Sequence, residues 1–158
     1  MEKGADYSNL VNKIILGLKE ASRKLKEMGY KSHHISPREF YDYMTGETPT
    51  GDTITITDVL GNEFLMIHEV VEISELKKLG IPIDKQTVMM SHPKLYENHC
   101  KATEYELDYA LSKGKYDWLK VRMNHAKSWL EDPNMPQHLI QRCKAIIKKY
   151  SDALKSSS

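Results

Sequence analysis

The residues in this chain best suited to chemistry by type and spacing are His68, Glu69 and Glu72. They lie within Phe64–Leu79 (FLMIHEVVEISELKKL), a segment otherwise rich in Ile, Val, Leu and Met. In a helix, His68 and Glu72 stand one turn apart on the same face, among apolar neighbours. A buried carboxylate is costly unless a cation, a proton or a hydrogen-bond donor accompanies it. The segment therefore predicts a helix that carries a polar site into the fold.

The run His68-Glu69-Val70-Val71-Glu72 resembles the zinc-binding helix of the zincin metallopeptidases, H-E-x-x-H, with glutamate in place of the second histidine. In that motif both imidazoles bind zinc and the intervening glutamate is the general base. The resemblance implies that His68 is a zinc ligand, Glu69 the general base and Glu72 the substituted ligand, because zinc also accepts carboxylate oxygen. It is confined to this segment and departs from the motif at a ligand position.

A second predicted helix, Pro93–Lys113, offers further ligands. Helical periodicity puts His99 on its inward face and Glu106, two turns later, at the margin of that face. We expect His99 to be the third metal ligand and Glu106 a fourth. Cys100 is an alternative, because zinc binds His, Glu and Cys side chains together. The sequence leaves open whether His68 and His99 are close in space.

The segment before the first of these helices predicts a β-strand. Asp52–Asp58 (DTITITD) alternates Thr and Ile with a period of two, which is typical of a half-buried strand. Gly61-Asn62 then supplies a turn before the helix. We therefore expect an α+β fold, predominantly helical, with about five or six helices and a small β-hairpin or short sheet.

The remaining helices follow from apolar periodicity and from capping residues. Ser36-Pro37 predicts an N-cap followed by the first helical residue. The chain length fits one domain over residues 1–158, with residues 154–158 as a disordered tail. The other predicted helices are Tyr7–Met28, a helix from Pro37 to Met44, a short turn after Asp84, Tyr116–Leu130 and Gln137–Leu154.

Composition is that of an ordinary globular protein, with 40% hydrophobic and 28% charged residues. There is no apolar run long enough to cross a membrane, so no membrane partner is expected. The N-terminus lacks the pattern of a secretion signal, and the two cysteines lack CxxC spacing. These features predict a reduced, cytoplasmic protein.

Charge is distributed unevenly along the chain. Residues 39–76 contain nine acidic residues and no Lys or Arg, whereas residues 113–158 contain ten basic residues and four acidic ones. The acidic block coincides with the candidate site and favours a cation there, although the same acids could face the basic helices. We interpret the basic helix faces as solvated surface and expect no nucleic-acid partner.

Three functions fit these features. The first is a zinc-dependent hydrolase that acts on a small-molecule or peptide substrate. The second is a non-catalytic helical module, for partner binding or homo-oligomerisation, in which His68 is a hydrogen-bonded core residue. The third is a magnesium-dependent nucleotide pyrophosphohydrolase, since Glu69-x-x-Glu72 resembles the first half of the carboxylate motif of those enzymes. The second half, Glu-x-x-Asp, is missing, because Glu104 and Asp108 are four residues apart.

Overall fold

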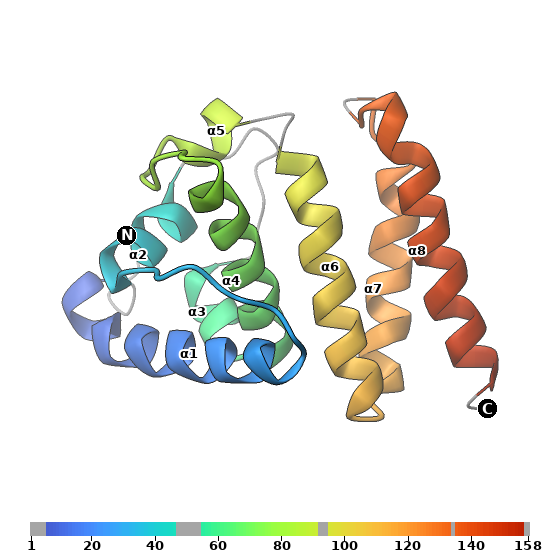
Figure 1. The fold of residues 1–158 in the computed structure, drawn as a ribbon, viewed down its shortest axis with the longest axis horizontal. Helices are drawn as coiled ribbons and strands as arrows, with labels where there is room; N and C mark the ends of the chain where they lie inside the picture. The colour runs from blue at the N-terminus through green and yellow to red at the C-terminus, as the bar shows by residue number, and fades with distance from the viewer. Residues whose placement is uncertain (1–5, 47–54, 92–94, 134, 157–158) are drawn as a thin grey trace.

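The computed structural model describes residues 6–46, 55–91, 95–133 and 135–156 (Figure 1). Within these ranges the chain forms eight α-helices. Their bounds are α1 Tyr7–Glu27, α2 Pro37–Thr45, α3 Ile56–Leu60, α4 Glu63–Lys78, α5 Thr87–Ser91, α6 Leu95–Ser112, α7 Tyr116–Trp129 and α8 Gln137–Ser156.

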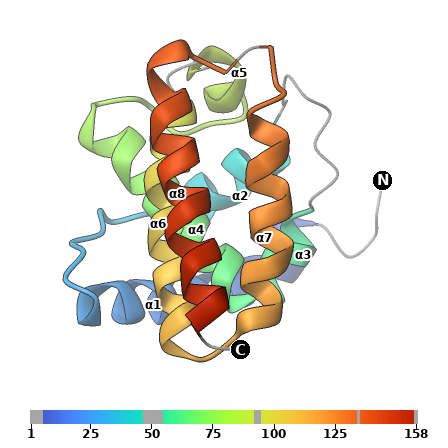
Figure 2. The same cartoon turned by 90° about the vertical axis from the view of Figure 1, so that its right-hand side faces the viewer.

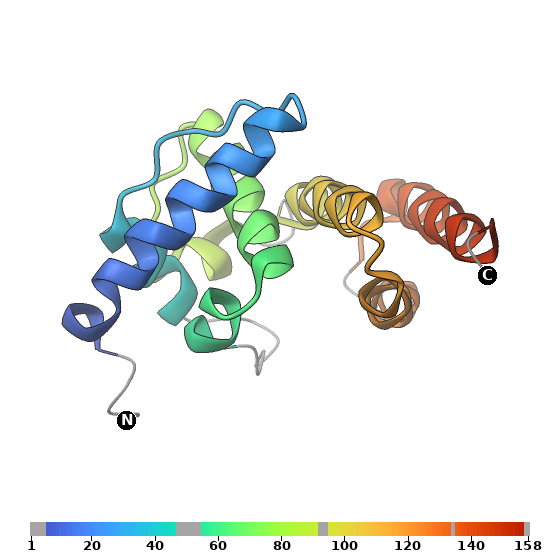
Figure 3. The same cartoon turned by 90° about the horizontal axis from the view of Figure 1, so that it is seen from below.

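Helix α4 lies at the centre of the fold. It packs mainly against α6 on one side and α1 on the other. Figure 1 shows α6 between α4 and the α7–α8 pair, and Figure 2 shows α6, α7 and α8 running side by side. Seen from below, α1, α2 and α3 gather around α4, away from α7 and α8 (Figure 3). Helices α4 and α6 are therefore buried between the two groups.

The apolar core has two clusters that correspond to these groups. One gathers buried side chains of α1 to α4 together with Ala102 and Tyr109 of α6, and the other gathers side chains of α6, α7 and α8. Phe64 of α4 and Trp118 of α7 pack against both clusters, with their rings stacked at 5.4 Å between centroids. This aromatic pair joins the two halves beside α6.

Local signals explain where α4 begins and ends. The side chain of Asn62 accepts hydrogen bonds from the backbone N–H groups of Phe64 and Leu65 and so caps the first turn. The helix ends before Gly80, whose φ of +79° is the left-handed conformation that glycine tolerates best. Between these ends α4 buries side chains around its whole circumference, including His68 and Glu72. The predicted helix Phe64–Leu79 is thus confirmed with a shift of one residue at each end.

The predicted β element is wrong, because the described residues contain helices and no strand or sheet. Residues 52–54 of the expected strand lie outside the described ranges, and the rest begins α3. The Thr55 side chain accepts from the Asp58 backbone N–H, and the Asp58 side chain accepts from the Thr55 N–H, forming a capping box. These two bonds satisfy free helix N–H groups, while Ile56 and Val59 are both buried one turn apart. The capping box therefore outweighs the alternation of Thr and Ile, and the segment forms a helix instead of a strand.

Several other helix predictions are confirmed. Ser36 caps α2 through a capping box with Glu39, and Pro37 is the first helical residue. Helix α8 continues to Ser156, so Leu154–Ser156, assigned to a tail by the sequence pattern, are helical. Residues 157–158 lie outside the described ranges. None of the helices in the described ranges combines the length and apolarity needed to cross a membrane.

Candidate metal centre

Three side chains that could hold a metal ion converge where α4 packs against α6. His68 Nε2 lies 3.1 Å from Glu72 Oε2 and 3.1 Å from His99 Nδ1. The third edge, from His99 Nδ1 to Glu72 Oε2, is 3.3 Å. We call these three atoms the donor triangle. His68 and Glu72 come from successive turns of α4, and α6 brings His99 against them.

Burial of the donor triangle is asymmetric. The side chains of His68 and Glu72 are 3% and 8% exposed, whereas that of His99 is 31% exposed. The ring of His99 packs edge-on against Trp129 of α7, with centroids 4.6 Å apart. Two donors are therefore fixed inside the fold, and the third stands where solvent can reach it.

Glu106 of α6 lies behind His68 rather than in the donor triangle. Its Oε1 is 2.9 Å from His68 Nδ1, on the opposite side of the ring from Glu72 and His99. In a neutral His68 that donates from Nδ1 to Glu106, the lone pair of Nε2 faces the triangle. Glu106 therefore orients the imidazole with its Nε2 toward Glu72 and His99.

Glu106 is itself held by α7. It is completely buried, and its carboxylate accepts from Arg122 Nη2 at 2.9 Å and from Trp118 Nε1 at 2.7 Å. Arg122 Nε also lies 2.7 Å from Glu106 Oε2, so the guanidinium approaches both carboxylate oxygens. This pairing neutralises a charge that would otherwise be costly to bury.

Glu72 is oriented from the other side by α2. The hydroxyl of Tyr43 donates to Glu72 Oε1, which leaves Oε2 for the donor triangle. Burial raises the pKa of Tyr43 well above its usual value, and the negative charges of Glu72 and Glu69 raise it further. Tyr43 therefore stays protonated and remains a donor to Glu72.

The titration behaviour of the site follows from these contacts. Burial alone would lower the pKa of His68, but its hydrogen bonds to Glu106 and Glu72 outweigh burial and raise the pKa to about 10. Burial would raise the pKa values of Glu72 and Glu106, yet their histidine and arginine partners bring both below the usual range. Burial lowers the pKa of His99, which favours its neutral, electron-donating form.

One prediction follows for the metal-free chain. The pKa of His68 is raised from 6.5 to about 10, so protonated His68 stabilises the fold fully below pH 6.5 and loses this effect as pH rises towards 10. We expect the free energy of unfolding, measured by urea denaturation in a chelator, to fall by about 2–4 kcal/mol across that interval. The variant His68→Gln should be less stable at neutral pH and should lose most of this dependence. An equal slope in both proteins would contradict the assignment.

The other candidates from the sequence lie outside the donor triangle. Glu69 is half-buried on α4, and its negative charge helps to raise the pKa of Tyr43. Cys100 points into the apolar cluster of α6, α7 and α8, where burial raises its pKa to about 11. Among the described residues, Cys100 does not belong to the cluster of side chains that could hold a metal ion.

Four residues that contact the site were missed by sequence reasoning: Tyr43, Trp118, Arg122 and Trp129. Arg122 carried a signal, because it falls on the buried face of α7 with Leu119, Met123 and Ala126. A charged side chain inside an apolar stripe indicates a buried partner. The two tryptophans and Tyr43 gave no such signal, since aromatic residues at helical spacing are ordinary core residues.

No protein family, curated protein or solved structure matches this chain.

Proposed function

We propose that the donor triangle binds a divalent cation and that the chain is a zinc-dependent hydrolase. Zinc is the cation that two histidine nitrogens and one glutamate oxygen favour. The observation that carries this proposal is the shape of the triangle, with edges of 3.1, 3.1 and 3.3 Å. Ligand atoms about 2.0–2.1 Å from a tetrahedral zinc ion are about 3.3 Å from one another. The triangle therefore has the dimensions of one face of a zinc tetrahedron.

Hydrogen bonding by itself accounts poorly for the triangle. If His68 gives its Nδ1 proton to Glu106, then His68 Nε2 and Glu72 Oε2 are both acceptors 3.1 Å apart. If His68 is doubly protonated and His99 donates from Nδ1, both N–H groups can reach Glu72 Oε2, but His68 Nε2 and His99 Nδ1 are then two donors only 3.1 Å apart. A cation at the centre would satisfy all three donor atoms together.

The donor set also favours a catalytic role over a purely structural one. Two histidines and one glutamate are the zinc ligands of catalytic sites such as that of thermolysin, which keep a fourth position open. No fourth ligand joins the three donors within the described residues, and His99 is partly exposed. Bound at this position, zinc would supply Lewis acidity and an acidified water. Glu69 follows His68 directly and would accept the proton, the role implied by the zincin resemblance.

The first test is the zinc content of the untagged protein, measured by mass spectrometry after growth with added zinc. We expect about one zinc per chain, held by three protein ligands. The variants His68→Ala, Glu72→Ala and His99→Ala should each weaken zinc binding by about a hundredfold or more, because each removes a ligand. His99→Ala is the most informative, since its partly exposed side chain can be removed with the least damage to the fold.

Two variants serve as controls. His138→Ala removes an exposed histidine of α8 that pairs with exposed Glu97, and should leave zinc binding unchanged. Cys100→Ala tests the ligand that the sequence left open, and should also keep its zinc. A folded wild-type protein that remains metal-free after supplementation and dialysis would overturn the proposal.

A second candidate, the non-catalytic helical module, is favoured by a different observation. His68 lies between two buried carboxylates that stabilise its protonated form, so the site can persist as an ion-pair network without metal. In that case His68→Ala would destabilise the fold by about 3–5 kcal/mol without changing metal content. The zinc measurement distinguishes the two candidates.

A further inference from the structure

One face of α7 lines the candidate metal centre. Trp118, Arg122, His125 and Trp129 recur at intervals of four, three and four residues, which places them along one stripe of the helix. Trp118 and Arg122 contact Glu106, and Trp129 contacts His99. Figure 2 shows α7 running alongside α6, which carries both Glu106 and His99. His125 is the remaining member of this stripe.

The position of His125 follows from its neighbours on the helix. Arg122 precedes it by about 4.5 Å along the axis and Trp129 follows it by about 6 Å, from the rise of an α-helix. Arg122 is buried and both tryptophans are half-buried, whereas His125 is exposed. The stripe therefore reaches solvent at His125, one turn before Trp129, whose ring contacts the partly exposed ring of His99.

The hydrogen bond to Arg122 determines which nitrogen of a neutral His125 carries the proton. His125 Nδ1 lies 3.2 Å from Arg122 Nη1. A guanidinium can only donate, so Nδ1 accepts and the proton of the neutral ring lies on Nε2. Arg122 is fixed in turn by its pairing with buried Glu106. His125 thus presents an oriented N–H donor. It is held by Arg122, which is held in turn by the Glu106 carboxylate that also orients His68.

We infer that His125 donates its Nε2–H to an oxygen of a ligand or substrate held at the donor triangle. This inference rests on the proposed zinc site and deepens it. The substrate class is a carboxylic acid derivative, an ester or amide, whose carbonyl oxygen gains negative charge when water attacks. An oriented N–H beside that oxygen stabilises the developing charge. Trp129 would form the adjacent apolar wall.

The test uses protein loaded with cobalt in place of zinc and acetohydroxamate as the probe. Acetohydroxamate resembles a carbonyl attacked by water, and its binding changes the visible spectrum of cobalt. We expect His125→Leu to bind cobalt as the wild type does and to bind acetohydroxamate about three- to tenfold more weakly, the usual effect of losing one hydrogen bond. His125→Gln, which keeps an N–H donor at similar reach, should recover most of the affinity.

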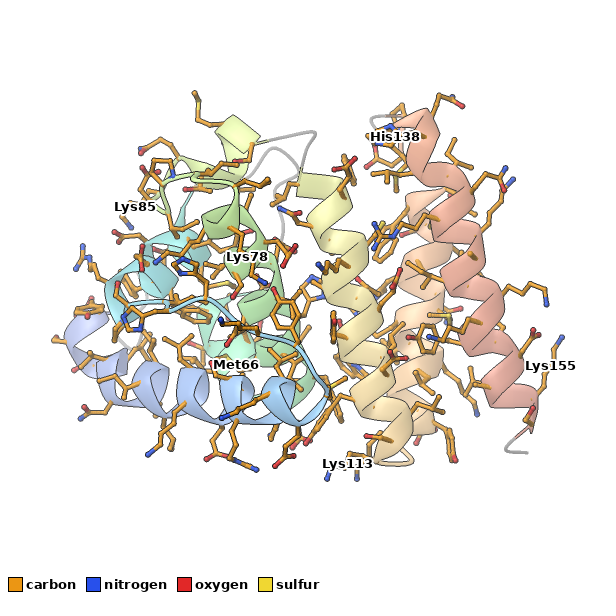
Figure 4. The ribbon with its side chains drawn as sticks, viewed as in Figure 1. Met66, Lys78, Lys85, Lys113, His138 and Lys155 are labelled. Atoms are coloured by element: carbon orange, nitrogen blue, oxygen red, sulfur yellow. The ribbon has the colours of Figure 1, made fainter. Side chains whose placement is uncertain are left out.

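The control is His138→Leu, which alters an exposed histidine in the first turn of α8 that pairs with Glu97 (Figure 4) and should bind the probe normally. Equal acetohydroxamate affinity in His125→Leu and wild type would overturn the role of His125 and leave the zinc site standing. Cobalt-loaded wild type that binds no acetohydroxamate would also overturn it. A wild type that binds neither cobalt nor zinc would overturn the metal proposal itself, so the two failures are distinguishable.

Discussion

Replacing Glu106 with alanine is expected to destabilise the fold by about 3–5 kcal/mol, measured by urea denaturation at pH 7 in a chelator. The carboxylate is completely buried and is the acceptor shared by Arg122, His68 and Trp118. Its removal leaves a buried guanidinium without a counter-charge and an indole N–H without an acceptor. The cost of these two uncompensated groups adds to the loss of packing volume.

The matched control for this variant is Glu104→Ala, two residues earlier on α6. Glu104 also pairs with an arginine, Arg142, but both side chains are more than one-third exposed. An exposed ion pair contributes about 0–1 kcal/mol, so the control should change stability little. Similar losses of stability in the two variants would show that the buried contacts of Glu106 do not stabilise the fold more than an exposed ion pair does.

Glu106→Ala should also weaken zinc binding by about 10- to 100-fold, because His68 loses its orienting partner.

Replacing Glu69 with glutamine is expected to preserve zinc binding and to reduce hydrolysis by about 10²- to 10⁴-fold, the usual contribution of a general base. Glutamine keeps the size of the side chain but cannot accept the proton of an attacking water. The measurement compares zinc-loaded proteins on a panel of 4-nitrophenyl esters, fluorogenic peptides and amides. The loss should appear in kcat rather than in zinc affinity.

The control for this variant is Glu63→Gln, which alters an exposed glutamate in the first turn of the same helix. It should retain full turnover. Undiminished hydrolysis by Glu69→Gln would assign the base to another group while leaving the zinc proposal intact. A wild type that carries zinc but hydrolyses no member of the panel would remove the hydrolase part of the proposal.

The sequence by itself determined most of the helices and placed two of the three members of the donor triangle on one helix face. Apolar periodicity and capping residues such as Ser36 and Asn62 act within a few residues of one another, so their effects can be read locally. His68 and Glu72 share a face because both belong to one helix. The local signal failed at Thr55–Asp58, where alternating Thr and Ile fit a strand and a capping box fits a helix. Choosing between them required the burial of Ile56 and Val59 against the rest of the fold.

Only the tertiary structure decided which side chains lie opposite the face of α4 that carries His68 and Glu72. His99 is separated from His68 by 31 residues, and its contact with Glu72 depends on how far α6 is displaced along α4. Periodicity gives the face of each helix, whereas side-chain packing between helices sets their relative height and rotation. The same register places Glu106 at the far nitrogen of His68 instead of in the donor triangle. It also brings Arg122 and His125 of α7 to the site, because the partners of a buried charge are chosen by packing rather than by spacing along the chain.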